Sequence, residues 1–142
     1  MDRVIVTGSR EWSKPNDARR MIVSRFFFMP VYTTIVVGFN PENNTPGGAD
    51  RFAYQEAQKL GLKIETHPAL WHEHDRNGES GVRCHCAEGK ETCKAAGFRR
   101  NEKMARLGAD LCLAFHNGKS KGTTDMAERA ERYGIEVEWL TL

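Results

Sequence analysis

A glycine, a hydroxyl and a guanidinium follow one another near the start of the chain, in the segment Gly8-Ser9-Arg10. A guanidinium donates several N–H bonds to phosphate or carboxylate, and a glycine lets the backbone approach a ligand closely because it has no Cβ. The segment follows Val4-Ile5-Val6-Thr7, an apolar run typical of a strand buried on both faces. We therefore expect the first strand to end at an anion-binding site.

Two further glycine-bearing segments precede predicted helices. Gly47-Gly48-Ala49-Asp50 leads into one helix, and Gly122-Thr123-Thr124 leads into another. The N-terminus of a helix offers unpaired N–H groups and a partial positive charge, both of which favour a bound phosphate. Either segment alone also fits an ordinary turn. Together with Gly8-Ser9-Arg10 they indicate a phosphate site.

A predicted helix over residues 98–107 directs one arginine inward. Arg100, Met104 and Leu107 stand at i, i+4 and i+7 and share one helical face. We expect Met104 and Leu107 to point at the sheet, so that Arg100 points inward from the first turn. A buried guanidinium is costly unless it meets an anion. The adjacent basic face is expected to be solvated and comprises Arg99, Lys103 and Arg106.

The elements that position these groups alternate along the chain. Apolar runs predict strands at residues 4–7, 34–38, 62–66, 110–115 and 136–140, and helical spacing predicts helices at 15–29, 50–60, 98–107 and 124–133. Such alternation predicts one Rossmann-like α/β domain over residues 1–142, with a mostly parallel sheet and helices on both faces. Ligands bind beyond the carboxyl ends of the strands of such sheets. The three glycine segments and Arg100 should therefore meet at that edge.

An irregular Cys/His-rich insertion at about residues 71–96 interrupts this alternation. Cys84, Cys86 and Cys93 with His85 form a candidate structural zinc site. Zinc would stabilise a polar segment that has little to bury and would place Arg99 and Arg100 at the rim of the ligand site. Free thiols in a surface loop are the competing interpretation, because Cys-x-Cys-x₆-Cys is not a common zinc spacing. Cys112 alternates with leucines in a strand and is expected in the core.

Composition limits the classes of protein that the chain can belong to. With 142 residues, 39% hydrophobic and 28% charged, it fits an ordinary globular domain. No apolar run approaches the roughly 18 residues that span a bilayer, so no membrane partner is expected. A net charge of +2 is too small to indicate nucleic acid by itself. The chain enters a strand at once, without a signal peptide pattern, which predicts a cytoplasmic protein with reduced thiols.

Several motifs, in order along the chain, resemble the YspA-like branch of the SLOG superfamily. They are Thr7-Gly8-Ser9-Arg10 with Trp12, Gly47-Gly48-Ala49-Asp50 with Ala53, His67-Pro68-Ala69 with Trp71, Arg100-Asn101 with Met104, and Gly122-Thr123 with Asp125-Met126. The resemblance implies a homo-oligomer that binds a nucleotide or a nucleotide-derived signal and requires no cofactor. The expected ligand-binding residues are Gly8, Ser9, Arg10, Gly47, Gly48, Asp50, Trp71, Arg100, Asn101, Gly122, Thr123 and Thr124. Trp71 either stacks on a base or packs as a lid on the domain.

The resemblance leaves two alternative functions open. Relatives of the lonely-guy type are phosphoribohydrolases that cleave nucleoside monophosphates, and here Arg100, Asp125 and Asp50 would be the catalytic residues. However, Asn101 replaces their lysine, Met126 replaces their glutamate, and Asp125 stands one residue early, a rotation of about 100° on a helix. The resemblance therefore supports nucleotide binding by this chain better than it supports hydrolysis. DprA-like relatives handle single-stranded DNA, which would follow the basic face of residues 99–106 and show a steep salt dependence.

Overall fold

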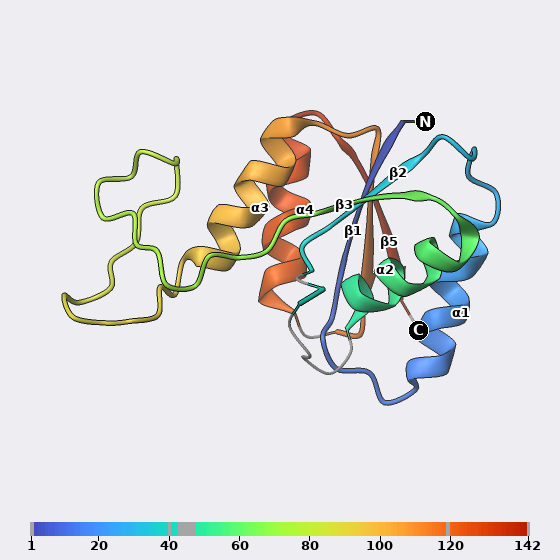
Figure 1. Ribbon diagram of the computed structural model, residues 1–142, viewed down its shortest axis with the longest axis horizontal. Helices are drawn as coiled ribbons and strands as arrows, with labels where there is room; N and C mark the ends of the chain where they lie inside the picture. Colours follow the sequence, from blue (N-terminus) through green and yellow to red (C-terminus); the bar gives the residue numbers. More distant parts are fainter. Residues whose placement is uncertain (1, 40, 43–47, 119, 142) are drawn as a thin grey trace.

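Parallel strands form the centre of the computed structural model, which describes residues 2–39, 41–42, 48–118 and 120–141 (Figure 1). Within these residues a 5-stranded sheet has the order β3-β2-β1-β4-β5. The strands are β1 (Arg3–Gly8), β2 (Thr34–Val37), β3 (Lys63–Thr66), β4 (Leu111–His116) and β5 (Glu136–Thr141). All four pairings are parallel. The predicted single α/β domain with a parallel sheet is confirmed.

The first strand lies in the middle of the sheet and of the core. Val4 pairs with Ile35 of β2 on one side and with Leu111 of β4 on the other. Val4 and Ile5 are fully buried because helices cover both faces of the sheet. Because both faces of the strand are buried, nearly all of its residues are apolar, which is the pattern from which the strand was predicted.

The helices form a layer on each side of the sheet (Figure 1). Their bounds are α1 (Pro15–Phe26), α2 (Ala49–Leu60), α3 (Ala96–Leu107) and α4 (Lys121–Arg132). α1 packs with α2 on one face, and α3 packs with α4 on the other. The chain runs outward from β1 to β3 and then crosses to β4, so the connections diverge between β1 and β4. Ligands bind at such a switch point. No helix in the described part of the chain could cross a membrane, given its length and polarity.

Several predicted helix details differ from the structure, among them the start of α3, which lies at Ala96 instead of residue 98. α1 ends at Phe26 instead of reaching Met29, because Pro30 disfavours the helical conformation in the residue before it. α4 begins at Lys121 instead of Thr124, since the side chain of Ser120 caps it. Leu107 is 55% exposed, although Met104 on the same face is buried. Leu107 is the last residue of α3 and extends beyond the buried part of the helix.

The insertion between β3 and α3 occupies residues 67–95 and contains no helix or strand, as expected. It projects beyond α3, away from the sheet (Figure 1). Its backbone is held by a turn around Asp75, whose carboxylate accepts the N–H groups of Gly78, Glu79 and Ser80 at 3.0, 3.1 and 2.8 Å. The hydroxyl of Ser80 and these N–H groups lower the pKa of Asp75. The insertion therefore has a defined local structure despite its lack of regular elements.

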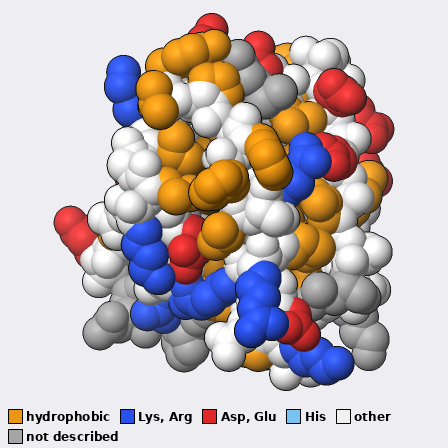
Figure 2. Space-filling view, turned by 90° about the vertical axis from the view of Figure 1, so that its right-hand side faces the viewer, with side chains coloured by type: hydrophobic (Ala, Val, Ile, Leu, Met, Phe, Trp, Pro, Cys, Tyr) orange, Lys and Arg blue, Asp and Glu red, His pale blue; other side chains and the backbone are white. Residues whose placement is uncertain are grey.

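Exposed apolar side chains gather on the side of the molecule formed by α1 and α2. Figure 2 views this side, with hydrophobic side chains across its upper and central parts and basic side chains along its lower part. Phe27, Phe28 and Val31 are 71%, 86% and 86% exposed at the end of α1 and just beyond it. The homo-oligomer implied by the resemblance stays a prediction.

An ion pair joins Arg3, the first residue of β1, to Glu65, the third residue of β3. Arg3 donates from Nη1 and Nη2 to Oε1 and Oε2 of Glu65 at 2.6 and 2.8 Å. Although partial burial of the carboxylate opposes it, this bidentate pair lowers the pKa of Glu65 to about 2, with a smaller contribution from His67. A lowered pKa stabilises the fold above the unfolded value near 4.5. That stabilisation is lost as the pH falls toward 2.

We expect Glu65→Gln to lower the free energy of unfolding by about 1 kcal/mol at pH 7, the upper value for a pair this exposed to solvent. The difference should persist down to pH 5 and shrink by pH 3, because pH 3 lies below the unfolded pKa near 4.5 and the unfolded chain then takes up a proton on this carboxylate. Urea denaturation of both proteins at pH 7, 5 and 3 measures it. Asp17→Asn, which breaks an exposed pair with Arg20, serves as control and should change little. A Glu65→Gln difference that is the same at all three pH values would contradict the prediction.

Candidate functional site

A crevice of about 700 Å³ opens at the carboxyl end of the sheet, beside the switch point between β1 and β4. Its walls come from the ends of β1 and β2, the first turn of α2, the insertion, and the N-terminal halves of α3 and α4. Eight of the residues expected to bind a ligand lie in its lining: Gly8, Arg10, Asp50, Trp71, Arg100, Asn101, Gly122 and Thr123. Segments far apart in the chain thus meet at the predicted edge.

Other expected ligand-binding residues lie outside the lining. Gly48 is the buried N-cap of α2, and the Thr124 hydroxyl donates to Ser120 O at 3.0 Å. Gly47 lies outside the described residues. Ser9 is 1% exposed, and its hydroxyl donates to Asn117 Oδ1 at 2.8 Å. Ser9 therefore joins the loops after β1 and β4.

Gly8 lets the first strand and α2 approach each other closely. A Cβ at this position would stand 2.4 Å from Ala49 Cβ and 2.6 Å from Phe115 O, so no side chain fits. The N–H of Ala49 also donates to Ser9 O at 3.0 Å. The N-terminus of α2 is therefore held directly against the end of β1.

The N-termini of two helices border the crevice. Asp50 lies in the first turn of α2, and Gly122 in the first turn of α4. The Ser120 side chain caps α4 by accepting the Thr123 N–H at 3.2 Å. A Cβ added at Gly122 would meet no atom within 4 Å. Gly122 lines the crevice, where the positive ends of both helix dipoles favour an anion.

Arg100 is fixed in the crevice by neutral acceptors. Its Nη1 donates to Gly38 O at 2.5 Å and to His67 O at 3.3 Å, and its Nε donates to Asn101 Oδ1 at 2.9 Å. Among the described residues Nη2 has no hydrogen-bond partner. A Cβ at Gly38 would lie 2.5 Å from Nη1, so the guanidinium needs glycine there. The positive charge is thus positioned without a carboxylate in direct contact.

A second cation adds to the positive field at this point. Burial lowers the pKa of Arg100, and the nearby charge of Arg10 lowers it further, whereas Asp50 and Asp125 act in the opposite direction. Arg10 and Arg100 both line the crevice. An anion bound between them would relieve their repulsion. Asp50, whose carboxylate accepts the Arg51 N–H at 3.0 Å, also lines the crevice.

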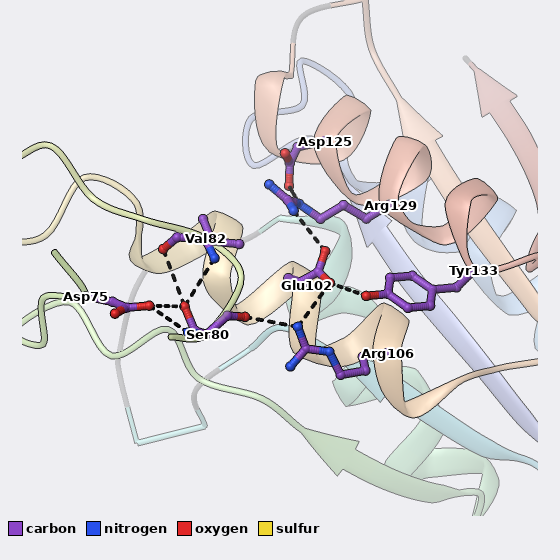
Figure 3. A network of polar contacts seen from close by, with 8 residues as sticks. All are labelled: Asp75, Ser80, Val82, Glu102, Arg106, Asp125, Arg129 and Tyr133. Atoms are coloured by element: carbon purple, nitrogen blue, oxygen red, sulfur yellow. Dashed lines mark hydrogen bonds and ion pairs between the residues drawn. The ribbon is translucent and has the colours of Figure 1, made fainter. Parts of the chain in front are cut away.

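Asp125, a candidate catalytic residue, lies behind the crevice wall. Its Oδ2 accepts Asn101 Nδ2 at 3.0 Å and Arg129 Nε at 2.9 Å, and Figure 3 shows it directed at Arg129. It is absent from the crevice lining. Asp125 therefore holds Asn101, which does line the crevice.

Glu102 of α3 binds Arg129 of α4 and also Arg106, which in turn contacts the insertion (Figure 3). It is 8% exposed and accepts from Arg129 Nη1 at 2.9 Å, from Arg106 Nη2 at 3.4 Å and from the Tyr133 hydroxyl. The Tyr133 hydrogen bond and the arginines lower the pKa of Glu102, although burial opposes this. Arg106 also donates to Ser80 O at 3.0 Å. The expected solvated basic face is therefore tied to the insertion at this residue.

Three cysteines and one histidine come together in the insertion. The ligand atoms of His74, Cys84, Cys86 and Cys93 all lie within 4.8 Å of one another. His85, the histidine chosen from the sequence, is exposed and is not in this group. Since Cys84 and Cys86 face the same side, the residue between them faces away. The group is consistent with a zinc site.

The electrostatics of the cluster favour thiolates. Burial opposes ionisation of Cys93, but hydrogen bonds from the Arg99 guanidinium and the Ala95 backbone outweigh it and lower the pKa. Arg99 Nη2 lies 3.1 Å from Cys93 Sγ. Cys112 differs, because it is fully buried in β4 and burial raises the pKa of its thiol to about 12. It belongs to the core, as expected.

Trp71 joins the cluster to the crevice. Its ring packs against Cys84, Cys93 and Ala96, and it also lines the crevice. Its carbonyl accepts the Cys93 N–H at 2.6 Å. Both expectations for Trp71, packing and a position at the ligand site, are compatible with this placement.

Several lining residues were not anticipated from the sequence: Glu11, Gly38, Lys94, Gly97, Phe98 and Asn117. Gly38 carried a signal, because it directly follows the apolar run of β2. Lys94 and Gly97 carried none, since the path of the insertion determines their place. Ser120, also in the lining, could have been found as the N-cap of α4.

The fold and the site together define a Rossmann-like parallel α/β domain with a crevice at its switch point and a Cys₃His cluster at the rim. The chain is 31% identical to the gene 61 protein of Mycobacterium phage D29 over 138 residues, which are 96% of this chain and 94% of the phage protein. It belongs to the same family as that phage protein. No protein-family model matches the chain.

Proposed function

We propose that the crevice binds a nucleotide or a nucleotide-derived ligand by its phosphate. Arg100 carries this proposal, because its half-buried guanidinium is held by neutral acceptors and its Nη2 has no hydrogen-bond partner among the described residues. Arg10 and the N-termini of α2 and α4 add positive potential around it. A volume of about 700 Å³ falls in the range of small-molecule sites.

The other lining groups suit the remaining parts of a nucleotide. The Trp71 ring offers a face for a base, and stacking of this kind tolerates different bases. The Asp50 carboxylate is acceptor-only and can accept hydrogen bonds from ribose hydroxyls. Both lie in the same crevice as Arg100. The chemical class of the ligand is therefore proposed from three different groups.

We also propose that the chain is a member of the SLOG superfamily, in its YspA-like branch. The residues of the resembling motifs supply much of the crevice, among them Gly8, Arg10, Trp71 and Arg100. The parallel sheet order agrees with a Rossmann-like relative. The described cysteines form no disulfide, and a Cys₃His metal site needs reduced thiols, which fits a reducing compartment such as the cytoplasm.

Hydrolysis of a nucleoside monophosphate is the second candidate function. The observation that favours it is the Asp50 carboxylate in the same crevice as Arg100. Asp125 is a weaker candidate for acid or base, because its carboxylate is engaged by Asn101 and Arg129. Single-stranded nucleic acid is less favoured, since Arg99 and Arg106 already donate to backbone carbonyls of the insertion.

Mass spectrometry of a mixed pool of nucleoside mono-, di- and triphosphates and cyclic dinucleotides tests the proposal. The protein is incubated with the pool and recovered, and both the solution and the material released on denaturation are measured. An intact nucleotide retained by the protein supports binding. Free base and ribose 5-phosphate in the solution would establish hydrolysis instead. Neither retention nor products would contradict both candidates.

A side chain added at Gly122 should block the crevice without disturbing the fold. The open space around this position accepts a Cβ, and glycine is a poor helix former. We expect Gly122→Val to retain about tenfold less nucleotide from the same pool, equivalent to about 1.4 kcal/mol, with an unchanged melting temperature. Thr124→Val, in the same turn but outside the lining, should retain as much as the unmodified protein. Equal retention by Gly122→Val would argue against this crevice.

A further inference from the structure

We propose that Cys84, Cys86, Cys93 and His74 hold one structural Zn²⁺ ion. A tetrahedral site with Zn–S bonds of about 2.3 Å separates its sulfur atoms by about 3.8 Å. The four ligand atoms already lie within 4.8 Å of one another, so small side-chain adjustments complete the tetrahedron. Three thiolates and an imidazole fill all four positions. A closed site of this kind is structural and leaves no position for a substrate.

The hydrogen bonds of His74 direct the correct nitrogen at the cluster. Its Nε2 lies 2.6 Å from Lys90 O, and since a carbonyl only accepts, Nε2 carries the proton. Its Nδ1 then has a free lone pair and lies 3.6 Å from Cys84 Sγ. Imidazole ligands of metals are commonly oriented by a carbonyl in this way.

Groups around the cluster balance its charge. A zinc ion with three thiolates carries one net negative charge, and the Arg99 guanidinium at 3.1 Å from Cys93 Sγ compensates it. The Lys94 N–H donates to Cys86 Sγ at 3.4 Å. Donors to ligand sulfur atoms are typical of the surroundings of a metal site. Arg99 also donates to Glu73 O at 3.1 Å, which ties the first turn of α3 to the insertion.

The insertion needs a stabilising metal ion because it buries few apolar side chains apart from the metal ligands. Its buried apolar residues are two of the ligands, Cys84 and Cys93, packed with Ala96. A segment from 67 to 95 without helix or strand is unusual in a compact domain unless something orders it. Metal binding contributes folding free energy directly to segments of this kind. The zinc site stands independently of any ligand in the crevice.

Metal analysis of the full chain, purified without chelator, tests the site. We expect close to one zinc per chain by mass spectrometry of the elements. Exchange of zinc for Co²⁺ should produce thiolate-to-cobalt charge transfer and the intense visible bands of tetrahedral coordination. His74→Ala should lose most of the metal and change this spectrum. His85→Ala, an exposed histidine between two ligands, is the matched control and should leave both unchanged.

Two results of the metal analysis would overturn the proposal. These are zinc below about one tenth per chain together with no charge-transfer band on adding Co²⁺, or equal metal loss in His74→Ala and His85→Ala. An intact mass lower by a pair of hydrogens would show a disulfide in place of the metal. If His74→Ala fails to fold, two measurements on the unmodified protein test the site instead. They are its cobalt spectrum and the rate at which its thiols are modified before and after chelation. Thiols that react equally fast in both states would contradict a bound metal.

Discussion

Arg100→Met should reduce retention of a nucleotide by on the order of 100-fold, because the variant loses a charge-assisted contact worth about 3 kcal/mol. Arg100 is a half-buried cation in the crevice, and among the described residues its Nη2 has no partner, which leaves it available to a phosphate oxygen. Methionine keeps a flexible unbranched stem but is shorter and carries no charge. It also removes the cost of burying a guanidinium, so the melting temperature should change little. Isothermal titration with the nucleotide recovered from the mixed pool measures the effect.

Lys103→Met is the matched control for this experiment. Lys103 lies on the same helix, carries the same charge and is exposed outside the crevice lining. Its replacement should leave the affinity within about twofold, because an exposed charge is screened by salt. If both variants lost affinity equally and the binding weakened steeply with salt, attraction to a general positive surface would explain it. That result would favour binding of single-stranded nucleic acid over binding of a nucleotide in the crevice.

The fold could be predicted because its signals are local. The apolar runs of β1 and β2 and the helical spacing of Ala18 and Ile22 in α1 each report burial within a few residues. A parallel sheet then follows from the alternation, and its carboxyl edge brings Gly8, Arg100 and Gly122 together without further information. The place of the site was therefore predictable from topology.

Roles that depend on contacts between distant segments were not predictable. The partner of Ser9 is Asn117 in the loop after β4, and the spacing along the chain gave no sign of it. Asp125 is engaged by Asn101 from a different helix. His85 was predicted as the fourth ligand, but the path of the insertion brings His74 to the cysteines instead. In each case the contact that decides the role joins two segments that are distant in the sequence. Sequence patterns describe each segment separately and do not show which segments meet.

The position of the crevice wall depends on the insertion. The Cys93 N–H holds the Trp71 carbonyl at 2.6 Å, and the Trp71 ring packs on the cysteines of the cluster. A Cβ at Gly97, in the first turn of α3, would lie 3.4 Å from that ring. Trp71 and α3 are thus held in contact at the rim, with Arg100 in the next turn. A loss of order in the cluster should therefore also disturb the wall of the ligand site.

Removal of zinc should loosen this wall before it affects the sheet. After chelation we expect hydrogen exchange to become at least tenfold faster across residues 71–96, because the insertion has little other burial, while the amides of β1 stay protected. Nucleotide retention should fall about tenfold in parallel, and added Zn²⁺ should restore both. Trp71→Ala separates the two effects, since it should weaken nucleotide binding and still hold zinc. If chelation removed the metal and left the exchange of the insertion unchanged, the metal would not be what orders this segment, whatever the crevice binds.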